Sequence, residues 1–362
     1  MGVRGLKKEL RSRGLVHEIM LSNFSNKKIA VDISNFMYKF KVTEGLDWKN
    51  KLLKLIIKLR EYNLHCTFVF DGKPPEDKDL ERQRRREAKE NINERVNQLK
   101  LDLENYVVTG EVTTLLRETN NKLLKGNKMN RLLLRSDPPI NIDKINEDIE
   151  KKSSHGTTIT REDTADAKRL LEILNIEYLQ APSEAESLAA WLHVNNKVDA
   201  IITEDTDVLC YGSEVYVSNI DLRTNKCEVV YLSEVLNEMN LSFYSFVDFC
   251  IMCSLDYNEN VPKVGIKNAY KLMIEHENID NWSQSNPEID ISMLRHIRCR
   301  EIFKTYNGIL VDGKPIDTYN TFFWGVIEDF KDINRKLIEL QVKFSLDEIK
   351  DAWKPLEIII EM

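Results

Sequence analysis

The feature that most constrains the fold is a set of short apolar runs that each stop at an acidic residue. KKIAVD stops at Asp32, CTFVFD at Asp71, and VDAIITED at Glu204 and Asp205. Runs of β-branched and aromatic residues with little alternation are typical of parallel strands that helices cover on both faces. The carboxyl ends of such strands form one crevice. We therefore predict an α/β fold with a mainly parallel central sheet, in which Asp32, Asp71 and Asp205 converge.

Acids gathered at one sheet edge require a counter-charge, because like charges at close range raise one another's pKa. Oxygen ligands of this kind suit Mg²⁺ or Mn²⁺. More acids stand where an element is predicted to start or end: Glu184, Glu186, Asp207 and Asp256. Any one of them alone reads as a helix cap or a surface acid. Together with the first three they predict a ring that binds two metal ions for phosphodiester hydrolysis.

The spacing of these acids predicts how they face the crevice. Asp205 and Asp207 are two residues apart, so in an extended segment both side chains point the same way. Glu184 and Glu186 would be splayed by a regular helix, and they can act together only in its first turn. APSE predicts Ser183 as the N-cap residue of that helix.

The composition indicates a globular chain of 362 residues with 42% hydrophobic content and a formal charge of −7. No apolar stretch approaches the roughly 20 residues that cross a bilayer, and the N-terminus lacks the apolar core of a signal peptide. We therefore expect an intracellular protein that does not associate with a membrane. Cys250 and Cys253 alone are spaced like metal ligands, but their apolar surroundings favour core packing over zinc, and disulfides are not expected. The negative net charge argues against a protein that attracts nucleic acid through the electrostatic field of the whole molecule. The basic knot RQRRR at 82–86 is usually only a solvated helix face and is easily misread as a nuclear-localisation signal, so its position has to decide its role.

Periodicity and turn signals divide the chain into four parts. The expected regions are an N-terminal α/β region (1–76), a charged helical segment with a poorly ordered insertion at 126–158 (77–160), an internal region (161–275) and a helical C-terminal region with Trp282, Trp324 and Trp353 in its core (276–362). Leu99, Leu101, Leu103, Leu115 and Leu116 are the apolar anchors expected in the charged segment. Thr160 and Asp163 resemble a capping box. Strands are predicted at 29–33, 66–70, 176–180 and 198–203, and helices at 48–63 and from Pro182.

Six motifs in one order resemble the flap endonuclease family of structure-specific 5′ nucleases. They are MGVRGLKKEL, IAVDISNFMYKF, FVFDGKPPEDK, APSEAESLAA, TEDTDVLCYG and SLDYNENVPKVGIKNA. The resemblance covers the chain to about residue 273, apart from the insertion. It implies a nuclease fold in which 1–76 is the N-terminal nuclease region, 77–160 the helical arch and 161–275 the internal nuclease region with a helix-two-turn-helix. It also implies two Mg²⁺ ions that Mn²⁺ can replace, and seven metal ligands: Asp32, Asp71, Glu184, Glu186, Asp205, Asp207 and Asp256. Glu204 is a flanking acid and is not among them.

The resemblance also assigns residues that contact DNA. Lys78 and Arg85, with Glu81 between them, match the arch cations that steer the scissile phosphate, and fixed cations there stabilise phosphoryl charge. Tyr38 matches an aromatic residue on which a base stacks; an ordinary core tyrosine is the alternative. Gly2 and Arg82 are further candidate DNA contacts.

NVPKVGIKNAYKLM resembles the helix-two-turn-helix that holds duplex DNA by its backbone. Lys263, Lys267 and Lys271 form a basic stripe beside the turn glycine, Gly265. Many relatives have a second glycine where this chain has Lys263, so potassium binding at the turn is not predicted.

The implied function is a metal-dependent DNA endonuclease with 5′ exonuclease capacity that cuts single-strand/double-strand junctions in replication or repair. The long stretch between Asp71 and Glu184 leaves open whether the arch threads a 5′ flap or opens for bubbles and Holliday junctions. A 5′-to-3′ exoribonuclease and a catalytically silent junction-binding scaffold are less favoured alternatives. We expect a monomer that binds branched DNA in the nucleus or at another site of DNA replication, with replication or repair proteins as candidate partners. No sliding-clamp motif of the Gln-x-x-Leu-x-x-Phe-Phe type was found.

Overall fold

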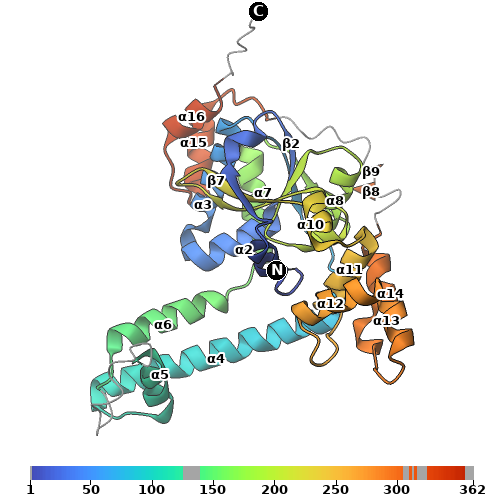
Figure 1. Ribbon diagram of the computed structural model, residues 1–362. Coiled ribbons are helices and arrows are strands. Elements are labelled where there is room, and N and C mark those ends of the chain that lie inside the picture. Colours follow the sequence, from blue (N-terminus) through green and yellow to red (C-terminus); the bar gives the residue numbers. More distant parts are fainter. Residues whose placement is uncertain (1, 125–138, 305–309, 312–313, 316–323, 355–362) are drawn as a thin grey trace, which may run out of the picture.

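The centre of the computed structural model, which describes residues 2–124, 139–304, 310–311, 314–315 and 324–354, is a seven-stranded sheet with helices on both faces (Figure 1). The strands are β1 (His17–Met20), β2 (Lys28–Asp32), β3 (His65–Phe70), β4 (Tyr178–Gln180), β5 (Ala200–Ile202), β6 (Val215–Asp221) and β7 (Lys226–Tyr231). Their order is β1-β7-β6-β5-β2-β3-β4. The five strands β6, β5, β2, β3 and β4 are parallel to one another, and β7 is antiparallel to its neighbours β1 and β6. The predicted α/β fold with a mainly parallel sheet is confirmed.

The central strand β2 shows how the sequence makes this sheet. Ile29, Ala30 and Val31 are completely buried, because β2 has β3 and β5 as neighbours and helices on both faces. Ile29 and Val31 belong to one core and Ala30 to the other. The strand ends one residue earlier than predicted, since the Asp32 carboxylate accepts a hydrogen bond from the Asn35 N–H and caps the next helix.

The helices fall into two groups that match the two cores. The first core includes residues of α2 (Ile33–Glu44), α3 (Trp48–Glu61), α7 (Arg161–Ile173), α15 (Phe330–Glu339) and α16 (Leu346–Ala352). The second core includes residues of α1 (Leu6–Ser12), α8 (Ala185–Val194), α9 (Asp207–Cys210), α10 (Leu232–Met239), α11 (Phe243–Met252), α12 (Ile266–His276), α13 (Ile279–Ser285) and α14 (His296–Ile302). β8 (Leu310–Val311) pairs antiparallel with β9 (Lys314–Pro315). Within the described ranges, no helix is long and apolar enough to cross a membrane.

The C-terminal residues contribute to both cores. Trp282 is buried with α13 in the second core, whereas Trp353 and the half-buried Trp324 pack in the first core beside the N-terminal half of the chain. Trp324 donates its indole N–H to the Leu64 carbonyl oxygen at 2.7 Å. Cys250 and Cys253 are buried in the second core as free thiols, which agrees with the packing interpretation.

The remaining predicted elements are present with shifted ends. The strands at 66–70, 176–180 and 198–203 correspond to β3, β4 and β5, and the helix at 48–63 ends at Glu61. Thr160 and Asp163 form the predicted capping box at the start of α7. Strands β1, β6 and β7 and helix α2 were not anticipated.

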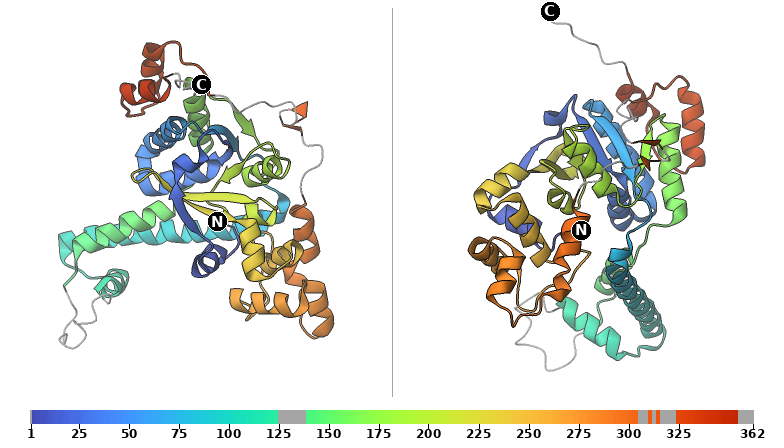
Figure 2. Two further views of the ribbon diagram at one scale, coloured as in Figure 1. Left: turned by 45° about the horizontal axis from the view of Figure 1, so that its top comes forward. Right: turned by 90° about the vertical axis from the view of Figure 1, so that its right-hand side faces the viewer.

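The arch is a pair of helices that extends away from the sheet, with a third helix at its far end (Figures 1 and 2). α4 (Asp79–Thr109) packs along α6 (Ile142–His155), and α5 (Thr114–Leu124) contacts both. The arch has a small core of its own, formed by Val96, Leu99, Leu103, Leu116, Ile145 and Ile149. Leu115 packs against this core, whereas Leu101, expected as an anchor, is 55% exposed because it lies on the outer face of α4.

The expectation of a poorly ordered insertion is wrong for residues 142–155, which form α6. Asn141 caps this helix by accepting a hydrogen bond from the Lys144 N–H. Ile145 and Ile149, one turn apart, are buried in the arch core. Ile142, Ile145 and Ile149 are the only apolar residues of α6 and follow helical spacing, but three in an otherwise polar segment give a weak signal. The packing against α4 shows that they are sufficient. The rest of the predicted insertion at 126–138 lies outside the described residues.

Candidate active site

The carboxyl ends of β2, β3 and β5 open into a cleft of about 990 Å³. Asp32 is the last residue of β2, Asp71 follows β3, and Asp205 lies in the turn after β5. The start of α8 and the loop after α11 supply further acids. The cleft is thus lined by six of the seven predicted carboxylates: Asp32, Asp71, Glu184, Glu186, Asp205 and Asp256.

The seventh acid, Asp207, is not oriented as predicted. It begins helix α9 instead of continuing an extended segment, and its N–H donates to Asp205 Oδ1 at 2.9 Å. Its side chain is completely buried and does not line the cleft. Neither carboxylate oxygen of Asp207 has a hydrogen-bond partner among the described residues. Because the chain turns after Asp205, the two side chains do not share one face.

The prediction that Ser183 is the N-cap residue of α8 is also wrong. Glu184 is the N-cap of α8, in an extended conformation with φ −99° and ψ 142°. The Ser183 carbonyl oxygen instead accepts a hydrogen bond from the Gly72 N–H at 2.5 Å. Gly72 allows this approach, since a Cβ there would lie 2.0 Å from the Ala181 carbonyl oxygen. The contact joins the loops after β3 and β4, so Asp71 and Glu184 reach the same cleft.

Polar neighbours that were not singled out in the sequence orient Asp32 and Asp71. The Thr203 hydroxyl and the Asn35 amide donate to Asp32 Oδ2 at 2.9 and 3.1 Å. The Asp71 N–H donates to the Ser34 hydroxyl at 3.0 Å, and Asp71 Oδ1 accepts from the N–H at the start of α8 at 2.8 Å. The signal available in the sequence was a threonine at the end of an apolar run, and the structure shows that Thr203 is completely buried.

Lys78 lies among the acids and directly precedes α4. Its ammonium forms an ion pair with Glu184, and it is 3.4 Å from Glu186 Oε1 and 3.6 Å from Asp256 Oδ2. It also lies 4.7 Å from the centre of the Tyr257 ring, whose hydroxyl donates to Glu184 Oε2 at 2.5 Å. Burial by itself lowers the pKa of Lys78, but the surrounding carboxylates raise it well above its ordinary value. The side chain is therefore a fixed cation.

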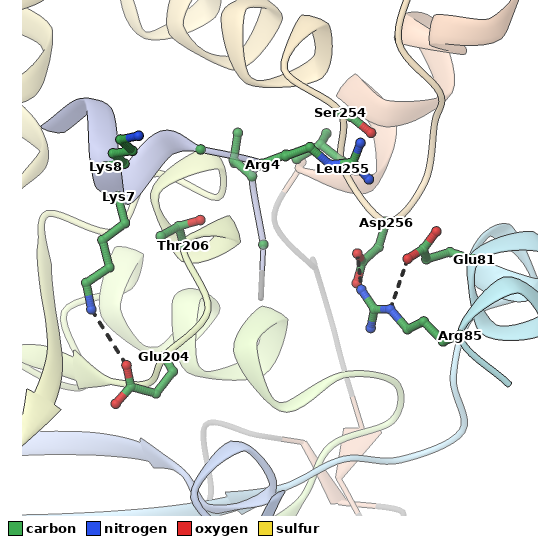
Figure 3. A pocket seen from close by; sticks show the side chains of 13 residues that line it. Arg4, Lys7, Lys8, Glu81, Arg85, Glu204, Thr206, Ser254, Leu255 and Asp256 are labelled. Carbon is green, nitrogen blue, oxygen red and sulfur yellow. Dashed lines mark hydrogen bonds and ion pairs between the residues drawn. The ribbon is translucent and has the colours of Figure 1, made fainter. Parts of the chain in front are cut away.

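Arg85, two turns further along α4, lies at the mouth of the cleft. Its guanidinium donates to Asp256 Oδ1 at 2.5 Å and to Glu81 Oε1 at 3.0 Å (Figure 3). Lys78, in the turn before α4, and Arg85, on α4, therefore approach the carboxylates from one stretch of chain, as the motif spacing suggested. Tyr257 is an additional site residue that the sequence analysis missed.

The start of α4 is also held from the C-terminal part of the chain. Asp77 Oδ1 accepts a hydrogen bond from Arg295 at 2.8 Å, and Asp77 Oδ2 accepts one from Arg298 at 2.9 Å. Hydrogen bonding to Arg298 is the largest of the effects that lower the pKa of Asp77. Arg295 also donates to the Tyr257 carbonyl oxygen at 3.3 Å. These contacts connect the two loops that hold Lys78 and Asp256.

The acids are in an environment that disfavours their charge. Burial, and then the charge of Glu186, raises the pKa of Glu184 to about 7 and that of Asp205 to about 6. Burial followed by the charge of Asp71 raises the pKa of Asp32 well above its ordinary value, and burial followed by the charge of Asp205 does the same for Asp207. A bound cation would relieve this cost.

The oxygen-rich donor set fits a hard divalent metal, and the unpartnered oxygens of Asp207 leave acceptors free for it or its hydration shell. Within the described part of the chain, no group of three or more His, Cys, Asp or Glu side chains is already arranged to hold a metal ion. The Lys78 and Arg85 cations occupy the space between the acids instead. Metal binding would therefore require these two side chains to move aside.

Three other predicted contacts lie around the cleft. Tyr38 is half-buried on α2 and lines it, with the Lys89 ammonium 5.0 Å from its ring centre. Arg82 also lines the cleft and pairs with Asp79 on its own helix at 2.9 Å. Gly2 has φ +86°, and a Cβ there would lie 2.3 Å from Asp205 Oδ1, so only glycine fits against the site.

The predicted helix-two-turn-helix is formed by α11, the loop that follows it and α12. Lys263, Lys267 and Lys271 are all exposed. Gly265 precedes α12 with φ −95°, whereas Lys263, at the position of the missing glycine, has φ +69°. The left-handed conformation is therefore kept without glycine, at a cost in strain of order 1 kcal/mol.

Comparisons with known proteins identify the family. The XPG N-terminal domain model matches residues 1–92 and the XPG I-region model matches residues 175–256. The "Probable RAD2-like endonuclease 076L" of Invertebrate iridescent virus 3 is 30% identical over 361 residues, covering 90% of this chain and 93% of that protein. Flap endonuclease 1 of Plasmodium vivax is 28% identical, covering 84% of this chain and 48% of that protein. The catalytic core of Rad2 in complex with DNA substrate has a TM-score of 0.61 at 17% identity, covering 97% of this chain and 99% of that one.

The chain therefore belongs to the XPG and flap endonuclease family of structure-specific 5′ nucleases, and it is an endonuclease. Enzymes of this family are metal-dependent, which agrees with the oxygen donors of the cleft.

Asp207→Asn tests the electrostatic cost of the site. Because the mutation removes a completely buried carboxylate that has no hydrogen-bond partner among the described residues, the metal-free protein should gain about 1–3 kcal/mol in its free energy of unfolding at neutral pH. Urea unfolding in the presence of a chelator measures this. Glu90→Gln, a change at an exposed acid of α4, should alter it by no more than about 0.5 kcal/mol. A loss of stability in Asp207→Asn would contradict the electrostatic account.

Proposed function

We propose that this endonuclease hydrolyses DNA phosphodiesters at junctions between single and double strands, and that it also acts as a 5′ exonuclease. The observation that carries the proposal is the placement of Lys78, just before α4, and of Arg85, on α4, at a ring of acids, with an arch beyond them. Relatives named flap endonuclease 1 and a related catalytic core in complex with DNA support the substrate class. Specificity would come from junction shape, because phosphate contacts position a duplex without reading its sequence.

The seven acids would hold two Mg²⁺ ions, which Mn²⁺ can replace. When bound, such ions activate a water and stabilise the leaving oxygen in phosphodiester hydrolysis. Asp32, Asp71, Glu184, Glu186, Asp205 and Asp256 would be ligands from the cleft wall, and the buried Asp207 would act from behind Asp205.

The remaining residues bind and orient the substrate. Lys78 and Arg85, which are paired with acids in the free protein, would turn to the scissile phosphate and stabilise charge on its oxygens. Tyr38 would stack on a base beside that phosphate, and Arg82 would contact a neighbouring phosphate. Gly2 would allow the strand to approach the site, while Lys263, Gly265, Lys267 and Lys271 hold the duplex.

The arch decides which junction is preferred. Its helices have their own core and a tie to the C-terminal part through Asp77, which supports a stable gateway over the cleft. We propose a 5′ flap as the substrate, with bubbles or Holliday junctions as the alternative. Action in replication or repair, in the nucleus or at another site of DNA replication, and a monomeric state stay predictions.

The experiment that tests the proposal is Mg²⁺-dependent cleavage of a matched set of labelled DNAs: 5′ flap, bubble, Holliday junction, nicked duplex and single strand. The flap is also tested with its 5′ end blocked. Flap preference that is lost on blocking would support a threading arch. Bubble or junction cleavage that is indifferent to the block would support an open gateway, and no cleavage of any DNA would overturn the proposal.

Asp205→Asn should reduce cleavage by about 100-fold or more and leave junction binding largely unchanged, since it removes a charge that orients the metal but none that holds the duplex. Single-turnover cleavage and a binding titration on the same flap measure the two effects. Loss of both together would count against the ligand role.

Lys267→Ala should weaken duplex affinity and reduce the slope of log affinity against log salt by about one, because one phosphate contact is lost. Lys54→Ala, an exposed lysine on α3, is the matched control and should leave the slope unchanged. If the slope of log affinity against log salt were the same in both variants, Lys267 would not contact the duplex and the predicted basic stripe would be wrong.

The thermal stabilisation produced by Mg²⁺ should be larger at about pH 8 than at about pH 5.5. Burial and neighbouring charge raise the pKa of Glu184 to about 7 and that of Asp205 to about 6, so the folded protein takes up protons there as the pH falls. Those protons compete with the metal and stabilise the metal-free fold. A shift in Tm that is equal at both pH values would contradict the assignment of these acids.

A further inference from the structure

A second cavity lies beside the cleft, on the other side of Arg85 and Asp256. It has a volume of about 450 Å³ and lies between the N-terminal segment, α4 and the 254–256 loop (Figure 3). We call it the N-terminal pocket and define it by Arg4, Lys8, Thr206, Ser254, Arg85 and Asp256. Arg85 and Asp256 line both cavities, so the two cavities adjoin at this ion pair.

The acids of this pocket are already neutralised. Asp256 and Glu81 both accept hydrogen bonds from Arg85. Glu204 is 2.5 Å from the Lys39 ammonium and 3.6 Å from that of Lys7. The pocket therefore has no unpaired anion that would repel a negatively charged ligand.

Two cations of the pocket remain free. Arg4 and Lys8 are exposed, and neither side chain has an ion pair or hydrogen bond with a described residue. Figure 3 shows Arg4 extending from the N-terminal segment toward Ser254 and Leu255. The Arg4 N–H donates to the Ser254 carbonyl oxygen at 3.1 Å, which holds the backbone of the N-terminal segment against the 254–256 loop.

A buried hydroxyl adds an independent indication of a ligand. Thr206 lines the pocket and is only 2% exposed, yet its hydroxyl has no hydrogen-bond partner among the described residues. Buried polar groups are almost always paired, so this donor is best explained by a ligand that the free protein lacks.

The position of the pocket indicates which part of a substrate it would meet. At one end it joins the acidic cleft through Arg85. At the other end a Cβ added at Gly5 would lie 3.7 Å from Ile266 Cδ1, at the start of α12 and next to Lys267. The pocket thus bridges the cleavage site and the proposed duplex-binding helix. None of the 13 side chains that line it is aromatic, so it is suited to the sugar-phosphate backbone and not to base stacking.

We propose that the N-terminal pocket binds a backbone phosphate of the substrate strand, on the duplex side of the cut, through Arg4 and Lys8. The inference rests on the proposed function. Arg4 and Lys8 hold the strand between the cleavage site and α12, and the Thr206 hydroxyl is a further donor at the pocket. Bound in this way, the strand enters the cleft in one register.

The first test measures flap-DNA affinity as a function of salt in an Asp205→Asn background, in which the substrate stays uncut. Arg4→Ala/Lys8→Ala should bind roughly tenfold more weakly at about 0.1 M salt, and the slope of log affinity against log salt should fall by about one to two. Lys27→Ala, an exposed lysine at the opposite end of β2, is the control and should bind as the parent protein does. Unchanged affinity and slope in the double variant would overturn the proposal.

The second test locates the phosphate. Single methylphosphonate linkages, which lack the charge, are placed one at a time on both sides of the cut. One linkage on the duplex side should weaken binding of the parent protein several-fold but have no further effect on Arg4→Ala/Lys8→Ala. The proposal would be overturned if, at every linkage, the loss of affinity from the methylphosphonate simply added to the loss from Arg4→Ala/Lys8→Ala. It would also be overturned if the two losses failed to add only at linkages on the single-stranded side. Failure of the proposed function itself would appear differently, as a wild-type protein that cleaves none of the DNAs.

Discussion

The Lys78 ammonium lies among carboxylates that would otherwise repel one another, and much of the surrounding structure serves to keep these charges together. Asn35 and Thr203 donate hydrogen bonds to Asp32, and Tyr257 donates one to Glu184. These contacts compensate burial only in part, because the pKa values of the buried acids are still raised. Repulsion between the buried acids therefore lowers the stability of the metal-free fold, and bound divalent cations would relieve it. The protein gives up stability in this way to keep a binding site.

Segments from the whole chain hold this arrangement in place. Gly2 packs against Asp205 at a distance that no side chain would permit, and Gly72 lets the loops after β3 and β4 meet. Arg295 and Arg298, more than two hundred residues from Asp77 in the sequence, fix the point at which α4 leaves the body. The arch thus starts from a rigid base, and its two catalytic candidates occupy defined positions relative to the acids.

The cavities suggest one continuous path for a nucleic-acid strand. The cleft with its acids, the N-terminal pocket with Arg4 and Lys8, and the exposed lysines of α12 follow one another along the molecule. The net charge of −7 does not conflict with this path, since the acids gather where metal ions are expected and the free cations lie where the backbone would pass. Local distribution of charge, and not its sum, makes the protein suited to DNA.

The sequence by itself determined the strands whose carboxyl ends lead to Asp32, Asp71 and Asp205, the capping box of α7 and the family, because these depend on local patterns and on the rule that parallel strands share a carboxyl edge. Only the tertiary structure decided that Asp207 is buried behind Asp205, that Glu184 and not Ser183 caps α8, and that 142–155 forms a helix. It also brought Arg4 and Lys8 to a pocket beside the cleft. Each of these depends on contacts between segments far apart in the chain, and no local periodicity encodes such contacts.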